Sequence, residues 1–192
     1  MNRAHTVKLI FIDVETTGIT CPESGLIQLA GTVEVDGNYQ EDFEYRIRPF
    51  PRDEISDEAL AVNGLSRAEI LDYSAPEEVY PTFVELLSRY VDRYDRSDKF
   101  HFVAYNARFD ADHIRAWFEK NGDKFYGSWF FHPPIDVMGI AAVHLMSRRA
   151  TMKDFKLATV AAELGLEVDD GKMHDARYDV GLTREMFNCF KK

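Results

Sequence analysis

The stretch VKLIFIDVE, residues 7–15, is apolar over most of its length and ends on two acids, Asp13 and Glu15. Side chains alternate between the two faces of a strand, and here both faces are apolar until the end. A strand that is buried on both faces lies in the middle of its sheet. The sequence therefore predicts a central strand that carries two neighbouring carboxylates at the edge of the core.

The composition is that of a globular protein, with 192 residues, 45% hydrophobic and 29% charged. This length predicts a single domain, residues 1–192. The first residues lack the apolar stretch of a secretory signal, and no segment is long and apolar enough to span a membrane. We therefore expect a cytoplasmic protein with no membrane partner. Two cysteines, Cys21 and Cys189, are too few for a disulfide framework or a cysteine metal site, and we expect them to be reduced.

The formal net charge of −10 argues against a protein that coats long stretches of nucleic acid through many phosphate contacts. It does not argue against an enzyme that acts on nucleic acid. Carboxylates gathered around divalent cations are counted as negative in the sequence, yet they present a positive centre once the cations are bound.

Strand patterns come first along the chain, and helical patterns follow. A turn at residues 36–38 joins two strands into a hairpin. The predicted strands are residues 7–15, 26–35, 41–50 and 99–105, with a short extended segment at 133–139. The predicted helices are residues 56–64, 76–94, 106–122 and 154–165, with a last one within 174–190. Ser74 and Glu77 predict a capping box for the helix at 76–94. This order predicts an α/β fold with a mixed five-stranded sheet, an antiparallel meander plus parallel strands, flanked by helices.

Two further acids stand at the heads of apolar helix faces. Asp110 lies one turn before the apolar stripe of its helix, and Asp179 does so in the last helix. Four carboxylates against one core would repel one another and lose solvation unless a cation lay between them. Ligands that are all oxygen suit Mg²⁺ or Mn²⁺. The predicted metal ligands are Asp13, Glu15, Asp110 and Asp179.

His174 precedes Asp179 by five residues, a spacing that puts the two on different sides of one continuous helix. The spacing suits a shared site only if His174 stands in the turn before the helix, and the polar segment with Gly171 fits a loop there. From a loop an imidazole can reach the carboxylates and deprotonate a water near neutral pH. We therefore predict that His174 is a general base.

Three segments resemble the motifs of the DEDDh-type 3′→5′ exonucleases of the DnaQ-like family. They are FIDVETTG at 11–18, NARFD at 106–110 and HDARYD at 174–179. This family includes the proofreading exonuclease of bacterial replicative DNA polymerase, ribonuclease T and oligoribonuclease. The similarity extends from about Val7 to Phe190. It implies a ribonuclease H-like fold and the removal of nucleoside monophosphates from a 3′ end with two divalent cations, Mg²⁺ or Mn²⁺.

The resemblance also implies a role for each residue of the site. Asp13 would bridge the two cations, Glu15 and Asp179 would hold the one that carries the attacking water, and Asp110 would orient the second. The five catalytic residues implied are Asp13, Glu15, Asp110, His174 and Asp179. The backbone around Thr16 and Thr17, together with Leu65, is implied to hold the terminal nucleotide, and Asn106 is a further predicted substrate contact.

Ordinary structural interpretations stay open beside these. Asp112 is a rival of Asp110, which could instead pair with a neighbouring arginine. Asp175 is a rival of Asp179, since an acid in the first turn is favoured by the helix dipole. One basic run stands out in an acidic chain and is either a solvated surface or a site for substrate phosphates. It contains Arg148, Arg149, Lys153 and Lys156.

The leading expectation is a metal-dependent exonuclease on single-stranded nucleic acid with a free 3′ end, with DNA as the first substrate. The alternatives are an exoribonuclease, a polymerase-associated proofreading or binding module, and a phosphoesterase on a small nucleotide. The chain ends soon after Phe190, without the tail through which polymerase-bound relatives reach their partner, so we expect a free-standing enzyme. A homodimer and a polymerase partner stay open.

Overall fold

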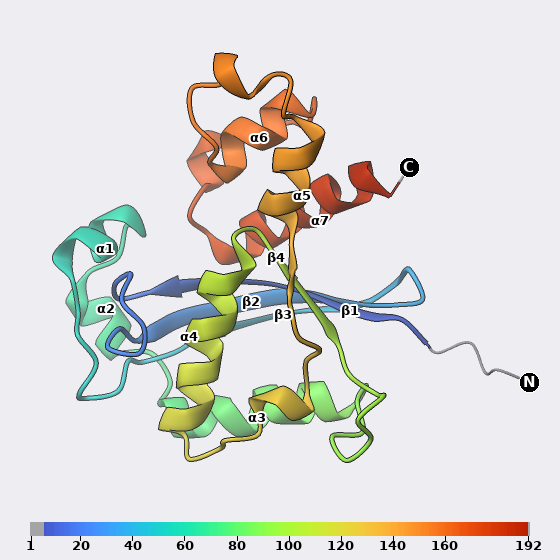
Figure 1. Cartoon of the computed structure of the whole chain (residues 1–192). Coiled ribbons are helices and arrows are strands. Elements are labelled where there is room, and N and C mark those ends of the chain that lie inside the picture. The colour runs from blue at the N-terminus through green and yellow to red at the C-terminus, as the bar shows by residue number, and fades with distance from the viewer. Residues whose placement is uncertain (1–5, 192) are drawn as a thin grey trace, which may run out of the picture.

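The computed structural model describes residues 6–191 and contains a five-stranded sheet with the strand order β3-β2-β1-β4-β5 (Figure 1). The strands are β1 (Lys8–Thr16), β2 (Leu26–Val35), β3 (Asn38–Arg46), β4 (His101–Ala104) and β5 (Ile135–Asp136). The central strand β1 pairs antiparallel with β2 and parallel with β4, and β5 continues the parallel part. The predicted mixed sheet, with β1 at its centre, is confirmed.

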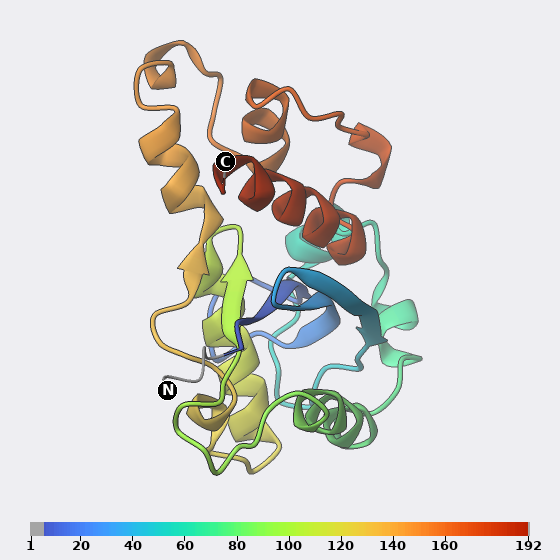
Figure 2. The ribbon, with the colours of Figure 1, turned by 90° about the vertical axis from the view of Figure 1, so that its right-hand side faces the viewer.

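The helices form two layers on opposite faces of the sheet, and a small pair lies beside one end of β1 (Figures 1 and 2). They are α1 (Asp57–Val62), α2 (Arg67–Leu71), α3 (Pro76–Ser88), α4 (Ala107–Lys120), α5 (Val137–His144), α6 (Leu157–Glu163) and α7 (Ala176–Phe190). Alternate residues of β1 face the two layers. Ile10 and Ile12 pack in the core with α3 and α4, whereas Leu9 and Phe11 pack in the core with α5, α6 and α7. Among the described residues, no helix is long and apolar enough to cross a bilayer.

The third strand lies earlier than the predicted range of 41–50. Asp36 and Gly37 both have positive φ values, 51° and 77°, so they form a two-residue turn and β3 begins directly at Asn38. After Arg46 the backbone N–H of Arg48 donates to the carbonyl of Ser74, which takes the chain away from β2. The prediction was therefore wrong at both ends of this strand.

Helix α3 ends at Ser88 and not near Tyr94 as predicted. Two contacts replace the helical hydrogen bond between the carbonyl of Tyr90 and the N–H of Tyr94. The ammonium group of Lys8 donates to the Tyr90 carbonyl, and the Tyr94 N–H donates to the Asp92 side chain. The segment after the helix is therefore held in a non-helical path by side-chain contacts, one of them from a residue distant in the chain.

Two smaller predictions were also wrong. The N-cap of α3 is Ala75, which makes no side-chain cap, and the capping box lies one helix earlier, between Ser66 and Glu69. The extended segment predicted at 133–139 contains only β5, because the Asp136 side chain accepts a hydrogen bond from the N–H of Met138 and starts α5 directly after the strand.

Candidate active site

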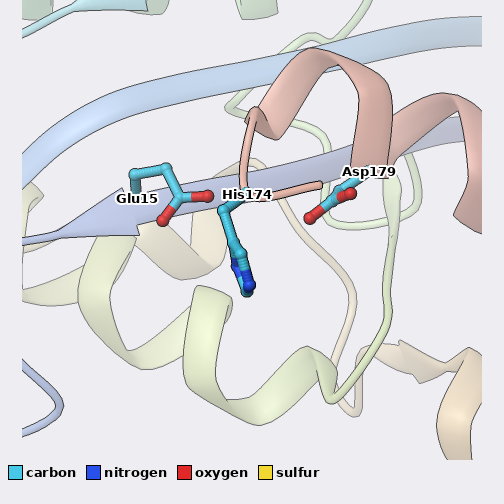
Figure 3. Close-up of side chains that lie close together, drawn as sticks. All are labelled: Glu15, His174 and Asp179. Carbon is cyan, nitrogen blue, oxygen red and sulfur yellow. The ribbon is translucent and has the colours of Figure 1, made fainter. Parts of the chain in front are cut away.

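Three side chains from separate parts of the chain converge at one end of β1 (Figure 3). Glu15 lies near the end of β1, His174 lies before α7, and Asp179 lies in the first turn of α7. Their nearest ligand atoms all lie within 4.8 Å of one another. An imidazole and two carboxylates at this separation can share a cation.

The turn before α7 brings His174 to this position. His174 has a φ of 66°, in the left-handed region, and α7 begins two residues later. The Asp175 carboxylate caps the helix by accepting hydrogen bonds from the N–H groups of Arg177 and Tyr178, at 3.0 Å and 3.3 Å. The structure therefore confirms that His174 stands in a turn and not within the helix.

Asp110 and Asp13 place two more carboxylates beside this group. Asp110 lies in the first turn of α4 and is 3% exposed. Its Oδ1 accepts a hydrogen bond of 3.1 Å from the N–H of Val14, which ties the start of α4 to β1 next to Asp13. Burial, followed by the charges of Asp110, Asp179 and Glu15, raises the pKa of Asp13 well above its ordinary value. The four acids predicted from the sequence are thus brought close enough to act on one another.

The other three acids are also shifted towards the protonated form. Burial, and then the charges of Asp179 and Asp110, raise the pKa of Glu15 to about 8. Burial raises the pKa of Asp110 to about 8, against the hydrogen bond from Val14. Burial raises the pKa of Asp179 to about 6. Without a cation, this group of carboxylates is stabilised by taking up protons.

The donor set fits divalent cations. Asp179 Oδ1 is buried and has no hydrogen-bond partner among the described groups, so it presents a free acceptor to the site. A cation offers such an atom a ligand bond and removes the repulsion between the carboxylates. The rival acids are used elsewhere: Asp112 lies 3.4 Å from the Arg108 guanidinium, and Asp175 caps α7.

A cavity of about 730 Å³ opens beside the three converging side chains. Glu15, His174 and the predicted contact Leu65 line it, together with Asn63. The Asn63 side chain donates a hydrogen bond of 3.3 Å to the carbonyl of Thr16, which holds the α1–α2 connection against the end of β1. Leu65 therefore lies in the same cavity as Glu15 and His174.

Thr16 and Thr17 have their hydroxyl groups inside the protein. The Thr16 hydroxyl donates to the carbonyl of Gly18 at 2.6 Å. Thr17 is 0% exposed, and its hydroxyl donates to the Glu54 carbonyl and accepts from the N–H of Gly25 at 2.7 Å. The Thr17 side chain therefore holds the loop after β1 in place, and a nucleotide contact through the backbone around Thr16 and Thr17 stays a prediction.

Asn106 lies apart from the main cavity. It is the N-cap of α4, with a φ of 61°, and its backbone N–H donates to Asp136 Oδ1 at 3.0 Å. Its side chain makes no cap, and the residue lines a separate cavity of about 240 Å³. The structure does not bring Asn106 together with Leu65 in one cavity.

The basic run predicted for phosphate binding also lies outside the main cavity. Arg148 lies 3.2 Å from the Glu163 carboxylate and donates to the Glu163 carbonyl at 2.9 Å. The Arg149 guanidinium lies 4.7 Å from the ring centroid of Phe155. These two arginines, with Lys153 and Lys156, lie along the connection between α5 and α6 and near the start of α6.

If this run binds the strand at a distance from the reacting bond, replacing both Arg148 and Arg149 with Gln should raise KM and leave kcat unchanged. The slope of log KM against log salt should fall by roughly 0.7 for each phosphate that the protein no longer neutralises. Steady-state kinetics on a single-stranded oligonucleotide at several salt concentrations measure both. An unchanged KM and slope would assign the run to a solvated surface.

The sequence did not predict which cationic residues line the main cavity. Arg46, Lys172 and Arg177 line it. Nothing in the strand pattern distinguishes Arg46, the last residue of β3. Positions 177, 181 and 185 are four apart, so the sequence places Arg177 on one helix face with Gly181 and Glu185. Only the structure shows that this face lines the cavity.

Comparison with known proteins places the chain in a family. Residues 10–187 match the RNase_T family model, an exonuclease family. The chain is 28% identical over 195 residues to ribonuclease T of Shewanella frigidimarina, covering 93% of this chain and 79% of that protein. It is 26% identical over 181 residues to the PolC-type DNA polymerase III of Thermotoga petrophila, covering 94% of this chain and 12% of the polymerase.

A solved structure shares the fold. Escherichia coli exonuclease I, in complex with a dT13 oligonucleotide, matches with a TM-score of 0.78 at 20% identity, over 97% of this chain and 41% of that one. The five-stranded sheet and its helices are therefore the ribonuclease H-like exonuclease fold that the motifs imply. Because residues 10–187 match the family model, the chain belongs to the RNase_T exonuclease family.

Proposed function

We propose that the protein is a metal-dependent 3′→5′ exonuclease that releases nucleoside monophosphates from the ends of single-stranded nucleic acid. The convergence of Glu15, His174 and Asp179 within 4.8 Å, beside the half-buried Asp13 and the buried Asp110, carries this proposal. Membership of an exonuclease family supports it.

The four carboxylates would hold the cations, two Mg²⁺ or Mn²⁺ ions. When bound, such cations stabilise the charge that develops on the phosphate and on the leaving 3′ oxygen. The carboxylates are held for this task by β1, by the first turn of α4 and by the first turn of α7. Because these elements belong to the packed core, the ligands need little rearrangement on binding.

His174 would act as the general base. One imidazole nitrogen takes a proton from the water that attacks phosphorus, the new P–O bond forms as the bond to the 3′ oxygen breaks, and the 3′ oxygen takes a proton from solvent. His174 is exposed, so the imidazole can return its proton to solvent after each turnover. Leu65 would supply an apolar surface for the terminal base.

Two substrate classes follow from the relatives. DNA is the substrate class of the PolC-type polymerase, of which this chain matches a small part, 12%. RNA is favoured by the similarity to ribonuclease T, which covers 79% of that protein. The polymerase match also supports a second candidate function, a proofreading unit that acts beside a polymerase. A homodimer stays a prediction.

A degradation assay tests the proposal directly. Single-stranded DNA, single-stranded RNA and duplex DNA of equal length, each labelled at the 5′ end, are incubated with Mg²⁺ or Mn²⁺. We expect a ladder of products shortened from the 3′ end on at least one single strand, and no ladder in EDTA. Endonucleolytic fragments, or a ladder that persists in EDTA, would contradict the mechanism.

Cation binding should also stabilise the fold. Adding Mg²⁺ to the metal-free protein is expected to raise Tm by several degrees, because bound cations remove the repulsion between buried carboxylates. Thermal melts followed by circular dichroism measure this. NaCl at matched ionic strength is the control, and an equal rise with NaCl would mean that general screening, not site binding, is responsible.

A further inference from the structure

Both positively and negatively charged side chains line the cavity beside the cluster of carboxylates. Two arginines line it, Arg46 from the end of β3 and Arg177 from the first turn of α7. Two acids, Glu167 and Glu185, line it as well and belong to no ion pair among the described residues. An anion that enters this cavity is therefore stabilised near the cations and repelled near these acids, and of the cations Lys172 is already paired with Asp169.

Arg46 is held in place before any ligand arrives. Its Nε donates to Glu44 Oε1 at 2.9 Å, and the same oxygen accepts from Gln28 Nε2 at 2.9 Å. Its Nη2 lies 3.8 Å from Asp175 Oδ2, and its side chain is 40% exposed. A guanidinium fixed through Nε keeps other N–H groups for a ligand, and it loses little conformational entropy when it binds a phosphate.

Arg177 is the freer of the two cations. Its side chain is exposed, and among the described side chains no carboxylate lies within ion-pair distance of its guanidinium. Its backbone is fixed by the N-cap at Asp175. Arg177 therefore lies in the first turn of a capped helix and lines a cavity that Glu15 also lines. Its guanidinium is available to an anionic ligand.

Gly181 leaves room beside these arginines. It lies inside α7 and lines the same cavity. A Cβ built at this position meets no atom within 4 Å. Glycine in a helix interior costs about 1 kcal/mol relative to alanine. Neither packing nor backbone conformation requires this glycine, and its effect is to widen the cavity along α7.

We propose that Arg46 and Arg177, with the open surface at Gly181, bind a phosphate of the single strand other than the one that is cleaved. This inference rests on the proposed function, since it concerns the same strand. The cavity of about 730 Å³ has room for more than the terminal nucleotide. The protein would therefore prefer chains with at least two phosphates over a dinucleotide with one.

Two substrates separate this phosphate from the cleaved one. A ten-nucleotide single strand carries several phosphates, and a dinucleotide with a free 5′ hydroxyl carries only the cleaved one. The variants are Arg46→Gln, Arg177→Gln and Gly181→Leu. For each we expect the ratio of kcat/KM on the ten-mer to that on the dinucleotide to fall at least about fivefold, the scale of one charge-assisted contact. Arg96→Gln, an exposed arginine in the segment between α3 and β4, is the control.

A binding measurement without catalysis completes the test. Fluorescence anisotropy of a labelled ten-mer in EDTA should show a weaker affinity in Arg46→Gln and Arg177→Gln, with an unchanged affinity in Arg96→Gln. Tm should not fall in Gly181→Leu, which excludes misfolding. Equal losses on both substrates, or unchanged ratios with unchanged affinity, would overturn the proposal. If the wild type cleaves neither substrate, the proposed function fails, and the anisotropy arm still decides whether the arginines bind the strand.

Discussion

Asp110→Asn is expected to abolish the proposed exonuclease activity and to make the metal-free protein more stable. The asparagine Oδ1 can still accept the hydrogen bond that Asp110 takes from the Val14 N–H at 3.1 Å. The negative charge is lost, so a cation loses a ligand and kcat should fall on the order of 10³-fold, the scale of losing one group that stabilises transition-state charge. The free energy of unfolding in EDTA should rise, because a buried carboxyl among like charges is removed.

The pH dependence gives the sign of this stability effect. The pKa of Asp110 is raised to about 8 in the folded protein, from an ordinary value of 3.8. Between these values the folded state binds a proton that the unfolded chain has released, so the stability of the metal-free wild type falls as the pH rises through this window. Asp110→Asn removes this contribution. Its Tm in EDTA should therefore exceed that of the wild type by more at pH 8 than at pH 5.

Asp112→Asn is the matched control for this variant. It lies on the same helix, and its side chain is 47% exposed beside Arg108. Activity should stay within about twofold of the wild type and Tm within about a degree, since exposed ion pairs contribute little. The assignment of Asp110 would be wrong if Asp112→Asn removed activity and Asp110→Asn did not.

His174→Asn is expected to lower kcat by about 10²–10⁴-fold, the range that a general base contributes. Asparagine suits the backbone at this position, because it is enriched among residues with positive φ, and His174 has a φ of 66°. The fold and the carboxylates should therefore be preserved. KM should change little, since the imidazole acts on the water and not on the strand. Single-turnover kinetics on a labelled single strand separate the chemical step from product release.

His144→Asn controls for the loss of a histidine as such. It is the last residue of α5, exposed, with its ring 5.2 Å from that of Phe190. Its kcat should match that of the wild type. If His174→Asn kept more than a third of the wild-type kcat, another group would have to accept the proton.

Much of the fold could be predicted because its signals are local. Apolar residues on both faces of β1 required a central strand, and the Asp-Gly pair at 36–37 required a hairpin. The four acids stood out because each interrupted an apolar pattern, which is costly unless a cation compensates it. The order and separation of the three motifs then indicated the family.

Other features depended on contacts between residues distant in the chain. The segment after α3 is held by Lys8, which donates to the carbonyl of Tyr90. The Thr17 hydroxyl bonds to Gly25 and Glu54 across the loop after β1, and the sequence did not indicate these partners. The periodicity of a segment says which face is buried, but not which distant group satisfies its hydrogen bonds.

The sequence by itself thus determined the central strand, the acids it carries and the position of His174 in a turn. Only the tertiary structure decided that Arg46 and Arg177 line the same cavity as Glu15, while Arg148 and Arg149 lie outside it. A basic residue has no periodic pattern that marks its partner. Its surroundings are fixed by the packing of β3, α7 and the α1–α2 connection around one cavity, and this packing exists only once the chain has folded.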